Sequence, residues 1–269
     1  MFDNLGLSEP QTWDEFLGVA AKIKDSGTTP FILGANAGWE PLFWFDYFIL
    51  RVAGSDFRNG LMNGTESYLD PKVVQAMELW ADLLDKGYFL DGFSSMDFQT
   101  MNSRFVKEDG AIQLMGAWTT RNLMKAGLTP DEDFGVFNFP TITDGLEPAV
   151  EGAVEGWSAS GAGANTENAL AMLKCVSGAK AQEHFAVMTN NPTANKDIPI
   201  EVYSEPTRNT VSKFYGMLDA PFHQNLELAT HPGVTEIAKR EFPRFLTYPD
   251  QYMAVLERLE DRRLKVFEQ

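Results

Sequence analysis

Three of the six tryptophans stand on short turns beside glycines. Trp39 is followed directly by Glu40, Trp118 follows a Gly-Ala pair, and Trp157 follows Glu155 and a glycine. A pyranose has one face of C–H groups that packs on an indole ring, and a rim of hydroxyl groups that hydrogen bond to carboxylates and amides. Tryptophans on flexible turns with carboxylates beside them therefore predict a site for a sugar.

Two charged residues near these turns are open to more than one interpretation. Arg121 lies one turn into the helix predicted after Trp118, where it would form a salt bridge or hold a sugar hydroxyl. Asp46, on a segment that is apolar nearly all round, would be a buried partner for a basic residue or a ligand contact. The other tryptophans fall within helical apolar patterns and are predicted to be core residues: Trp13, Trp44 and Trp80.

The charge of the chain excludes several classes of partner. Its 269 residues include 22 Lys and Arg against 38 Asp and Glu, a formal net charge of -16, so nucleic acid and anionic membranes would be repelled. The single cysteine, Cys175, is predicted to be a buried free thiol, and the three histidines lack the spacing of metal ligands. No metal or cofactor is expected. No apolar stretch is long enough to span a membrane, and residues 1–4 do not resemble an export signal.

Helices dominate the predicted secondary structure, and the strands are short. Thr12 and Glu15 have the spacing of a capping box, and Asp70 with the proline after it marks another helix start. A Gly-, Ala- and Ser-rich stretch at 149–162 is predicted to be an extended hinge. The predicted strands are 28–34, 111–115 and 134–140. The second of these leads to Trp118 at a strand-to-helix turn, where ligands of α/β proteins collect.

Five segments, in order, closely resemble one protein family: residues 12–54, 69–89, 105–123, 137–142 and 150–186. The family is the sugar-specific extracellular solute-binding proteins of ABC importers, which includes maltose-binding protein. The resemblance covers essentially the whole chain. It implies an α/β, periplasmic-binding-protein-like fold of two lobes that close on a sugar in a shared cleft and then dock on a membrane permease. It also implies an extracytoplasmic location, either periplasmic or as a cell-surface lipoprotein.

The resemblance implies a division of the chain into lobes. Residues 1–152 would be the first part of the C-terminal lobe, 153–215 a partial N-terminal lobe with the hinge, and 216–269 a return to the C-terminal lobe. Family members have an export signal and further βαβ units before the segment that matches the start of this chain. Without them, the helices expected at 165–176 and 179–188 would have an uncovered apolar face, through which the chain could associate with itself.

The resemblance also assigns roles to individual residues. Trp118 matches a tryptophan that stacks on a sugar ring at the end of a strand. Trp39 and Glu40 match a turn where an aromatic or acidic side chain meets the ligand. Two hinge residues and one residue of a polar turn complete the set: Glu155, Trp157 and Asn191.

Two other classes of function remain open from the sequence. A glycoside hydrolase needs two carboxylates flanking the scissile bond, and either Glu151 with Glu155 or Glu40 with Asp46 would supply them. Neither pair is fixed by a rigid strand end, and no nucleophile elbow or phosphate-binding loop is found, so we expect no catalytic residues. The third class is a helical interaction module that binds no small ligand.

Overall fold

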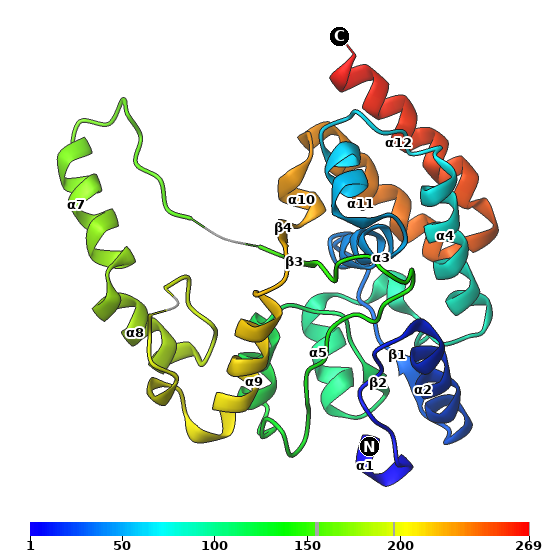
Figure 1. The fold of residues 1–269 in the computed structure, drawn as a ribbon, viewed down its shortest axis with the longest axis horizontal. Coiled ribbons are helices and arrows are strands. Elements are labelled where there is room, and N and C mark those ends of the chain that lie inside the picture. The colour runs from blue at the N-terminus through cyan, green and yellow to red at the C-terminus, as the bar shows by residue number, and fades with distance from the viewer. Residues whose placement is uncertain (154–155, 196, 269) are drawn as a thin grey trace. The chain divides into compact units, whose positions relative to one another are not determined.

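The computed structural model describes residues 1–153, 156–195 and 197–268 (Figure 1). The chain forms two compact units. Unit 1 consists of Met1–Met115, Phe137–Gly152 and Ala220–Gln269, and unit 2 consists of Gly116–Val136 and Ala153–Asp219. The units therefore put residues 116–136 together with the segment predicted as a partial lobe. The assignment of the lobes themselves stays a prediction.

Unit 1 is built mainly of helices joined by short strands. Its helices are α1 (Phe2–Leu5), α2 (Trp13–Asp25), α3 (Glu40–Met62), α4 (Pro71–Asp85), α5 (Phe98–Val106), α10 (Leu226–Ala229), α11 (Pro232–Thr247) and α12 (Tyr252–Phe267), with 3-10 turns η1 (Phe93–Ser95) and η3 (Pro249–Gln251). The predicted capping box is confirmed, because the Thr12 side chain accepts from the Glu15 backbone and the Glu15 side chain accepts from Thr12. Asp70 caps α4 as expected.

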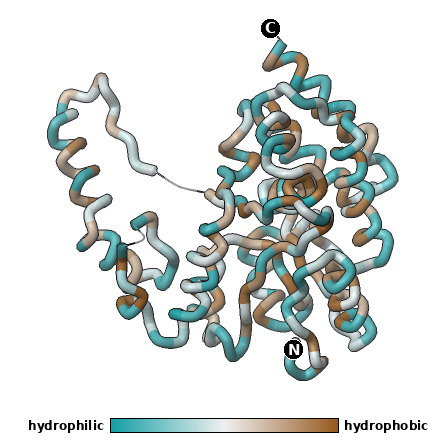
Figure 2. The backbone as a smooth tube through the Cα atoms, viewed as in Figure 1, coloured by the Kyte–Doolittle hydropathy of each residue, from teal (hydrophilic) through white to brown (hydrophobic). Residues whose placement is uncertain are grey.

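Helix α3 forms the centre of the unit 1 core. It packs against α4, α10 and α11, and Figure 2 shows its hydrophobic residues in the middle of this unit. Trp44 and Trp80 are fully buried, which confirms their prediction as core residues, and Trp13 packs against the same core while partly exposed. Because α3 is apolar on nearly every side, it is surrounded by other elements rather than exposed along one face.

The described strands form two parallel pairs of three residues each. Strand β1 (Thr29–Phe31) pairs with β2 (Gly110–Ile112), and β3 (Val150–Gly152) pairs with β4 (Phe222–Gln224). Both β1 and β2 are shorter than predicted.

The strand predicted at 134–140 is wrong, because this segment makes only an isolated bridge between Pro130 and Phe134. The Arg51 side chain makes hydrogen bonds to this segment where a neighbouring strand would otherwise bind. Arg51 donates from Nε to the Phe139 carbonyl at 3.1 Å and from Nη2 to the Asn138 side chain at 3.3 Å.

Unit 2 has a small core. Its helices are α6 (Trp118–Lys125), α7 (Thr166–Ser177), α8 (Ala179–Thr189) and α9 (Glu205–Met217), with the 3-10 turn η2 (Ile200–Val202). The core of η2, α8 and α9 centres on four buried residues: Ala186, Ile198, Tyr203 and Val211.

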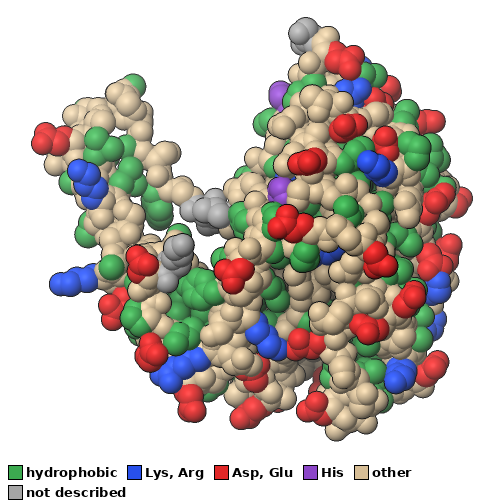
Figure 3. Space-filling view, in the orientation of Figure 1, with side chains coloured by type: hydrophobic (Ala, Val, Ile, Leu, Met, Phe, Trp, Pro, Cys, Tyr) green, Lys and Arg blue, Asp and Glu red, His purple; other side chains and the backbone are tan. Residues whose placement is uncertain are grey.

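Apolar side chains of α7 and α8 are exposed, which agrees with the uncovered apolar surface that the resemblance implied. They are Leu170, Met172, Phe185, Val187 and Met188. Figure 3 shows hydrophobic side chains at the surface of this part of the chain. The prediction that Cys175 is a buried thiol is wrong, because it lies on the exposed helix α7. Helix α7 packs against α8 but leaves much of its surface exposed, so its apolar pattern did not specify the burial of Cys175.

None of the described helices combines the length and the apolar composition that a membrane span requires.

Candidate functional site

In unit 1, Trp39 lies on a tight turn directly before α3. Gly38 has a φ of +76° and approaches the Lys239 carbonyl so closely that a Cβ atom would clash with it. The Trp39 ring packs against Phe43 and Phe98, with centroids 5.5 Å and 5.6 Å away. These contacts hold the half-buried indole in one orientation on the turn.

Glu40, the first residue of α3, is fully buried. Neither of its carboxylate oxygens has a hydrogen-bond partner of good geometry within the described chain. Burial raises its pKa to about 7, and the negative charges of Asp97 and Glu227 add to the rise, while backbone N–H groups at the start of the helix oppose it. Glu40 is therefore a carboxyl group with unused hydrogen-bonding capacity that changes its charge near neutral pH.

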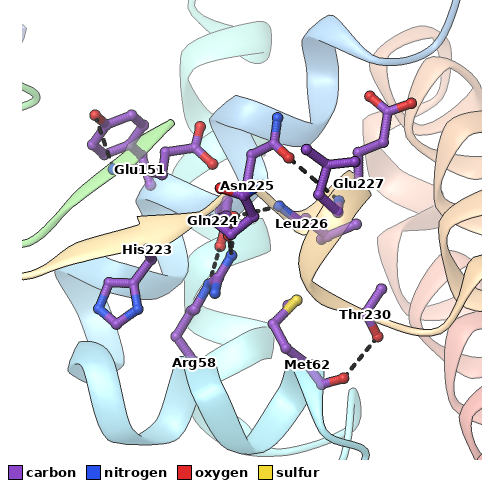
Figure 4. Close-up of polar contacts among 12 residues, drawn as sticks. Arg58, Met62, Glu151, His223, Gln224, Asn225, Leu226, Glu227 and Thr230 are labelled. Carbon is purple, nitrogen blue, oxygen red and sulfur yellow. Dashed lines mark hydrogen bonds and ion pairs between the residues drawn. The ribbon is translucent and has the colours of Figure 1, made fainter. Parts of the chain in front are cut away.

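Asp46 is a buried partner for a basic residue, one of the two interpretations open from the sequence. Arg58 donates from Nε to Oδ1 at 2.8 Å and from Nη2 to Oδ2 at 2.6 Å, and both side chains are almost fully buried. Oδ2 also accepts from the Leu226 backbone at 2.9 Å. Arg58 Nη2 donates in addition to the Gln224 carbonyl at 2.5 Å (Figure 4). The ion pair thus attaches the backbone at Gln224 and Leu226, where the chain has re-entered unit 1, to helix α3.

Glu151 on β3 and His223 on β4 lie beside this ion pair (Figure 4). The Glu151 backbone donates to the Tyr47 hydroxyl at 3.5 Å, and its Oε2 is buried without a partner in the described part of the chain. Burial raises the pKa of Glu151 well above its ordinary value, and the neighbouring Asp46 raises it further. His223 Nε2 and the Ser55 hydroxyl lie 2.9 Å apart, and burial lowers the pKa of His223.

In unit 2, Trp118 is the first residue of α6. Its indole ring lies directly over Gly116, where any side chain would collide with the six-membered ring. This contact gives a physical reason for the glycine in the Gly-Ala-Trp sequence, since only a residue without Cβ allows the ring to lie there.

Arg121 lies three residues after Trp118 on α6, so the two side chains leave neighbouring positions of the helix. It lines a pocket of about 230 Å³ in unit 2. The other lining residues are Met124, Lys125, Met188, Thr189 and Asn190. The next residue, Asn191, donates from its backbone to the Thr189 hydroxyl at 3.2 Å, and its side-chain Oδ1 is buried without a partner among the described residues.

Trp157 is 77% exposed, so its ring is not part of the packed core of unit 2. Glu155 lies outside the described residues. In unit 1, Trp39 and Glu40 are neighbours in the chain. In unit 2, Arg121 lines a pocket together with Asn190, the residue before Asn191.

Sequence reasoning missed the polar cluster around Asp46. Arg58 is twelve residues from Asp46, a spacing that no helical rule pairs, and His223 is far away in the sequence. The sequence analysis named Glu151 only as one of the two carboxylates that a glycoside hydrolase would need. The one usable signal was Asp46 itself, since an acidic residue within an apolar helix needs a partner.

Within the described ranges, no group of three or more His, Cys, Asp or Glu side chains is arranged to hold a metal ion.

Comparison with known proteins matches this chain to one family. The model of the bacterial extracellular solute-binding proteins matches residues 1–183. A probable sugar-binding periplasmic protein of Mesorhizobium japonicum is 29% identical over 147 residues, 54% of this chain and 34% of its own. An ABC transporter extracellular-binding protein of Pyrococcus horikoshii is 24% identical over 205 residues, 76% of this chain and 45% of its own. The chain therefore spans less than half the length of these relatives.

Solved structures share the fold over nearly all of the chain. A chitin oligosaccharide binding protein superposes with a TM-score of 0.86 at 21% identity, covering 99% of this chain and 67% of its own. The bacterial solute receptor AcbH, described as having an exclusive preference for β-D-galactopyranose, gives a TM-score of 0.81 at 22% identity, covering 99% and 68%. The predicted class, an α/β, periplasmic-binding-protein-like two-lobe fold, is confirmed, and this chain covers about two thirds of the length of these solved chains.

Proposed function

Because this chain belongs to the family of bacterial extracellular solute-binding proteins, we propose that it captures a carbohydrate for import by an ABC transporter. The family is one of transport proteins and not a class of enzymes. In this proposal the sugar is bound and released unchanged, and the permease subunits of the transporter are the protein partners. The full-length protein would act outside the cytoplasm, in the periplasm or as a lipoprotein on the cell surface.

The observation that carries the proposal is the combination of Trp39 and Glu40. A half-buried indole, oriented by two phenylalanines, stands next to a buried carboxyl group whose oxygens have no partner of good geometry. Burying a carboxyl group without hydrogen bonds of good geometry costs free energy. In the proposed complex the carboxyl group becomes accessible to the ligand, and a hydroxyl that donates to it recovers that cost. Stacking on the ring and a hydrogen bond to the carboxylate are the two contacts that a pyranose needs.

On unit 2, we propose that Trp118 supplies a second stacking surface and that Arg121 and Asn191 supply polar contacts. The pocket beside α6 and the unpartnered Oδ1 of Asn191 support these roles. Trp157 has an exposed ring that is available to a ligand. Glu155 is proposed as a hinge contact on the family resemblance alone.

A fluorescence titration tests the proposal. The six tryptophans give an intrinsic signal, which should change and saturate with one or more members of a panel of galactose, chitin oligosaccharides and raffinose. Leu170→Ala, at an exposed position on α7, is the control variant and should titrate as the wild type does. No saturable change with any sugar would contradict the proposal.

The structure also bears on the hydrolase alternative. Asp46 accepts hydrogen bonds from Nε and Nη2 of Arg58 and is buried, so it is not free to act with Glu40 on a glycosidic bond. Incubating the protein with the sugar that it binds and assaying for new reducing ends separates the two functions. We expect none to form.

Self-association is a second candidate function, favoured by the exposed apolar side chains of α7 and α8. Burying such a patch against a second copy would remove apolar surface from water. Sedimentation at increasing concentration tests it, and the double variant Val187→Ser, Met188→Ser should shift the chain toward monomer. A wild type that sediments as a monomer at every concentration would exclude this function.

A further inference from the structure

Strands β3 and β4 are the connectors of unit 1. The chain leaves unit 1 directly after Gly152, the last residue of β3, and returns at Ala220, two residues before β4. The two strands pair in parallel, with Val150 donating to Pro221 and Asn225 donating to Gly152, both at 2.9 Å. The contacts that hold this strand pair on helix α3 therefore fix the places where the chain leaves unit 1 and re-enters it.

Asp46 and Arg58, which lie beside these strands, already balance each other's charge without Glu151. Asp46 carries one negative charge, and Arg58 neutralises it through two hydrogen bonds. Both are buried, so little solvent screens any additional charge. An ionised Glu151 would place a second carboxylate against a single guanidinium group.

Among the described residues, no cation besides Arg58 is paired with Glu151. His223 on β4 has its pKa lowered by burial, and its Nε2 lies against the Ser55 hydroxyl. Arg51 on α3 stands over the Tyr47 ring and donates to two backbone carbonyls and the Asn138 side chain. Tyr47, whose hydroxyl accepts from the Glu151 backbone, has its pKa raised by burial and stays neutral.

We propose that Glu151 is protonated near neutral pH, that it shares this proton with Asp46, and that the shared proton holds connector strand β3 on helix α3. As a neutral acid, Glu151 donates its proton to the carboxylate of Asp46, and its buried Oε2 remains without charge. The raised pKa of Glu151, caused by burial and by Asp46, agrees with this assignment. The hydrogen bond between Glu151 and Asp46 holds β3 on α3 while Glu151 is protonated, and it is lost once the pH exceeds the folded-state pKa of Glu151.

The sign of the pH effect follows from linkage. A carboxyl group whose pKa is higher in the folded state keeps its proton there after the unfolded chain has lost it, so stability falls as pH rises above the ordinary value. For one proton, the ratio of folded to unfolded chain falls by up to tenfold for each pH unit in that window, which begins near pH 4.5.

Glu151→Gln tests the proposal, because the glutamine amide donates to Asp46 as the acid does but cannot ionise. Its free energy of unfolding should fall less steeply with pH than that of the wild type between about pH 5 and pH 8. Glu147→Gln makes the same substitution at an exposed position four residues earlier and should keep the wild-type slope. Equal slopes for the wild type and Glu151→Gln would overturn the proposal.

Two measurements on the folded protein do not depend on the variant. The ¹³C signal of the Glu151 carboxyl group should titrate well above the range of exposed glutamates, and titration within that range would overturn the proposal. Hydrogen-exchange protection of the Val150 and Asn225 amides, corrected for intrinsic rates, should fall as Glu151 ionises. Protection that stays constant through that titration would show that the proton does not anchor β3.

Discussion

Arg58 donates two hydrogen bonds to Asp46, which lies twelve residues earlier in the same helix, from Nε to Oδ1 at 2.8 Å and from Nη2 to Oδ2 at 2.6 Å. In a straight helix, residues twelve positions apart lie about 18 Å apart along the axis. The contact forms because α3 is broken at Gly54, which has φ 82° and ψ 175°. The break lets the second half of α3 bring its arginine to the buried carboxylate of the first half.

The first prediction is that Gly54→Ala destabilises unit 1 by about 1–3 kcal/mol, because this backbone conformation is accessible essentially only to glycine. Chemical denaturation measures the change. Gly18 is the matched control, since it lies within α2 with open space where a Cβ would be added. Gly18→Ala should leave stability unchanged or raise it slightly. Equal behaviour of the two variants would contradict the role of Gly54.

The second prediction concerns the buried ion pair. Arg58→Met should cost about 3–5 kcal/mol of folding free energy, because it leaves Asp46 as an uncompensated buried charge. Arg104→Met breaks an ion pair with Asp109 that is partly exposed and should cost at most about 1 kcal/mol. Similar losses in the two variants, measured by denaturation at one pH, would rule out the assigned importance of the Arg58 pair.

Local signals in the sequence predicted much of the fold. The capping box at Thr12 and the Asp-Pro start at Asp70 are set by neighbouring residues, and both helices begin where expected. The prediction of a strand at 134–140 was wrong because a distant residue, and not the neighbours of this segment in the sequence, determines its backbone contacts. Its apolar residues have the composition of a strand, but its backbone is bound by Arg51, a residue that is distant in the sequence.

The third prediction is that sugar affinity rises with pH through neutrality because Glu40 ionises. If only the carboxylate accepts the sugar hydroxyl, affinity at pH 6 should be about tenfold weaker than at pH 8, since the binding-competent fraction changes by that factor around a pKa of about 7. Calorimetric titration at the two pH values measures it. Glu40→Gln should lose this dependence, and the exposed-site variant Glu147→Gln should keep it. A pH-independent wild type would remove Glu40 from the site.

The fourth prediction uses the contact between Gly116 and Trp118. Gly116→Ala should push the indole from its position, because a Cβ there collides with the ring. Sugar affinity and the tryptophan fluorescence spectrum should both change while the unit stays folded by far-ultraviolet circular dichroism. Gly135→Ala, in the same unit with open space around its Cβ position, is the control. An unaltered affinity for Gly116→Ala would show that the position of this ring is unimportant for binding.

The candidate site was only partly predictable from the sequence. Trp39 and Glu40 are neighbours in the chain, so their turn was visible in the sequence, and so was the glycine that precedes Trp118. The burial of Glu40 and its unused oxygens depend on how α3 packs within unit 1, which no local pattern specifies. The charge balance around Glu151 joins α3, β3 and β4, and it required the tertiary structure for the same reason.

The most direct test of the central claim is calorimetric titration of the wild type and Trp118→Ala with the sugar that gives a response in the fluorescence panel. A stacked indole predicts saturable binding by the wild type and a loss of about 1–3 kcal/mol of binding free energy in the variant. If the folded variant binds that sugar as tightly as the wild type, Trp118 is not a stacking residue. If calorimetry detects no sugar binding by the wild type, carbohydrate capture by this chain is contradicted.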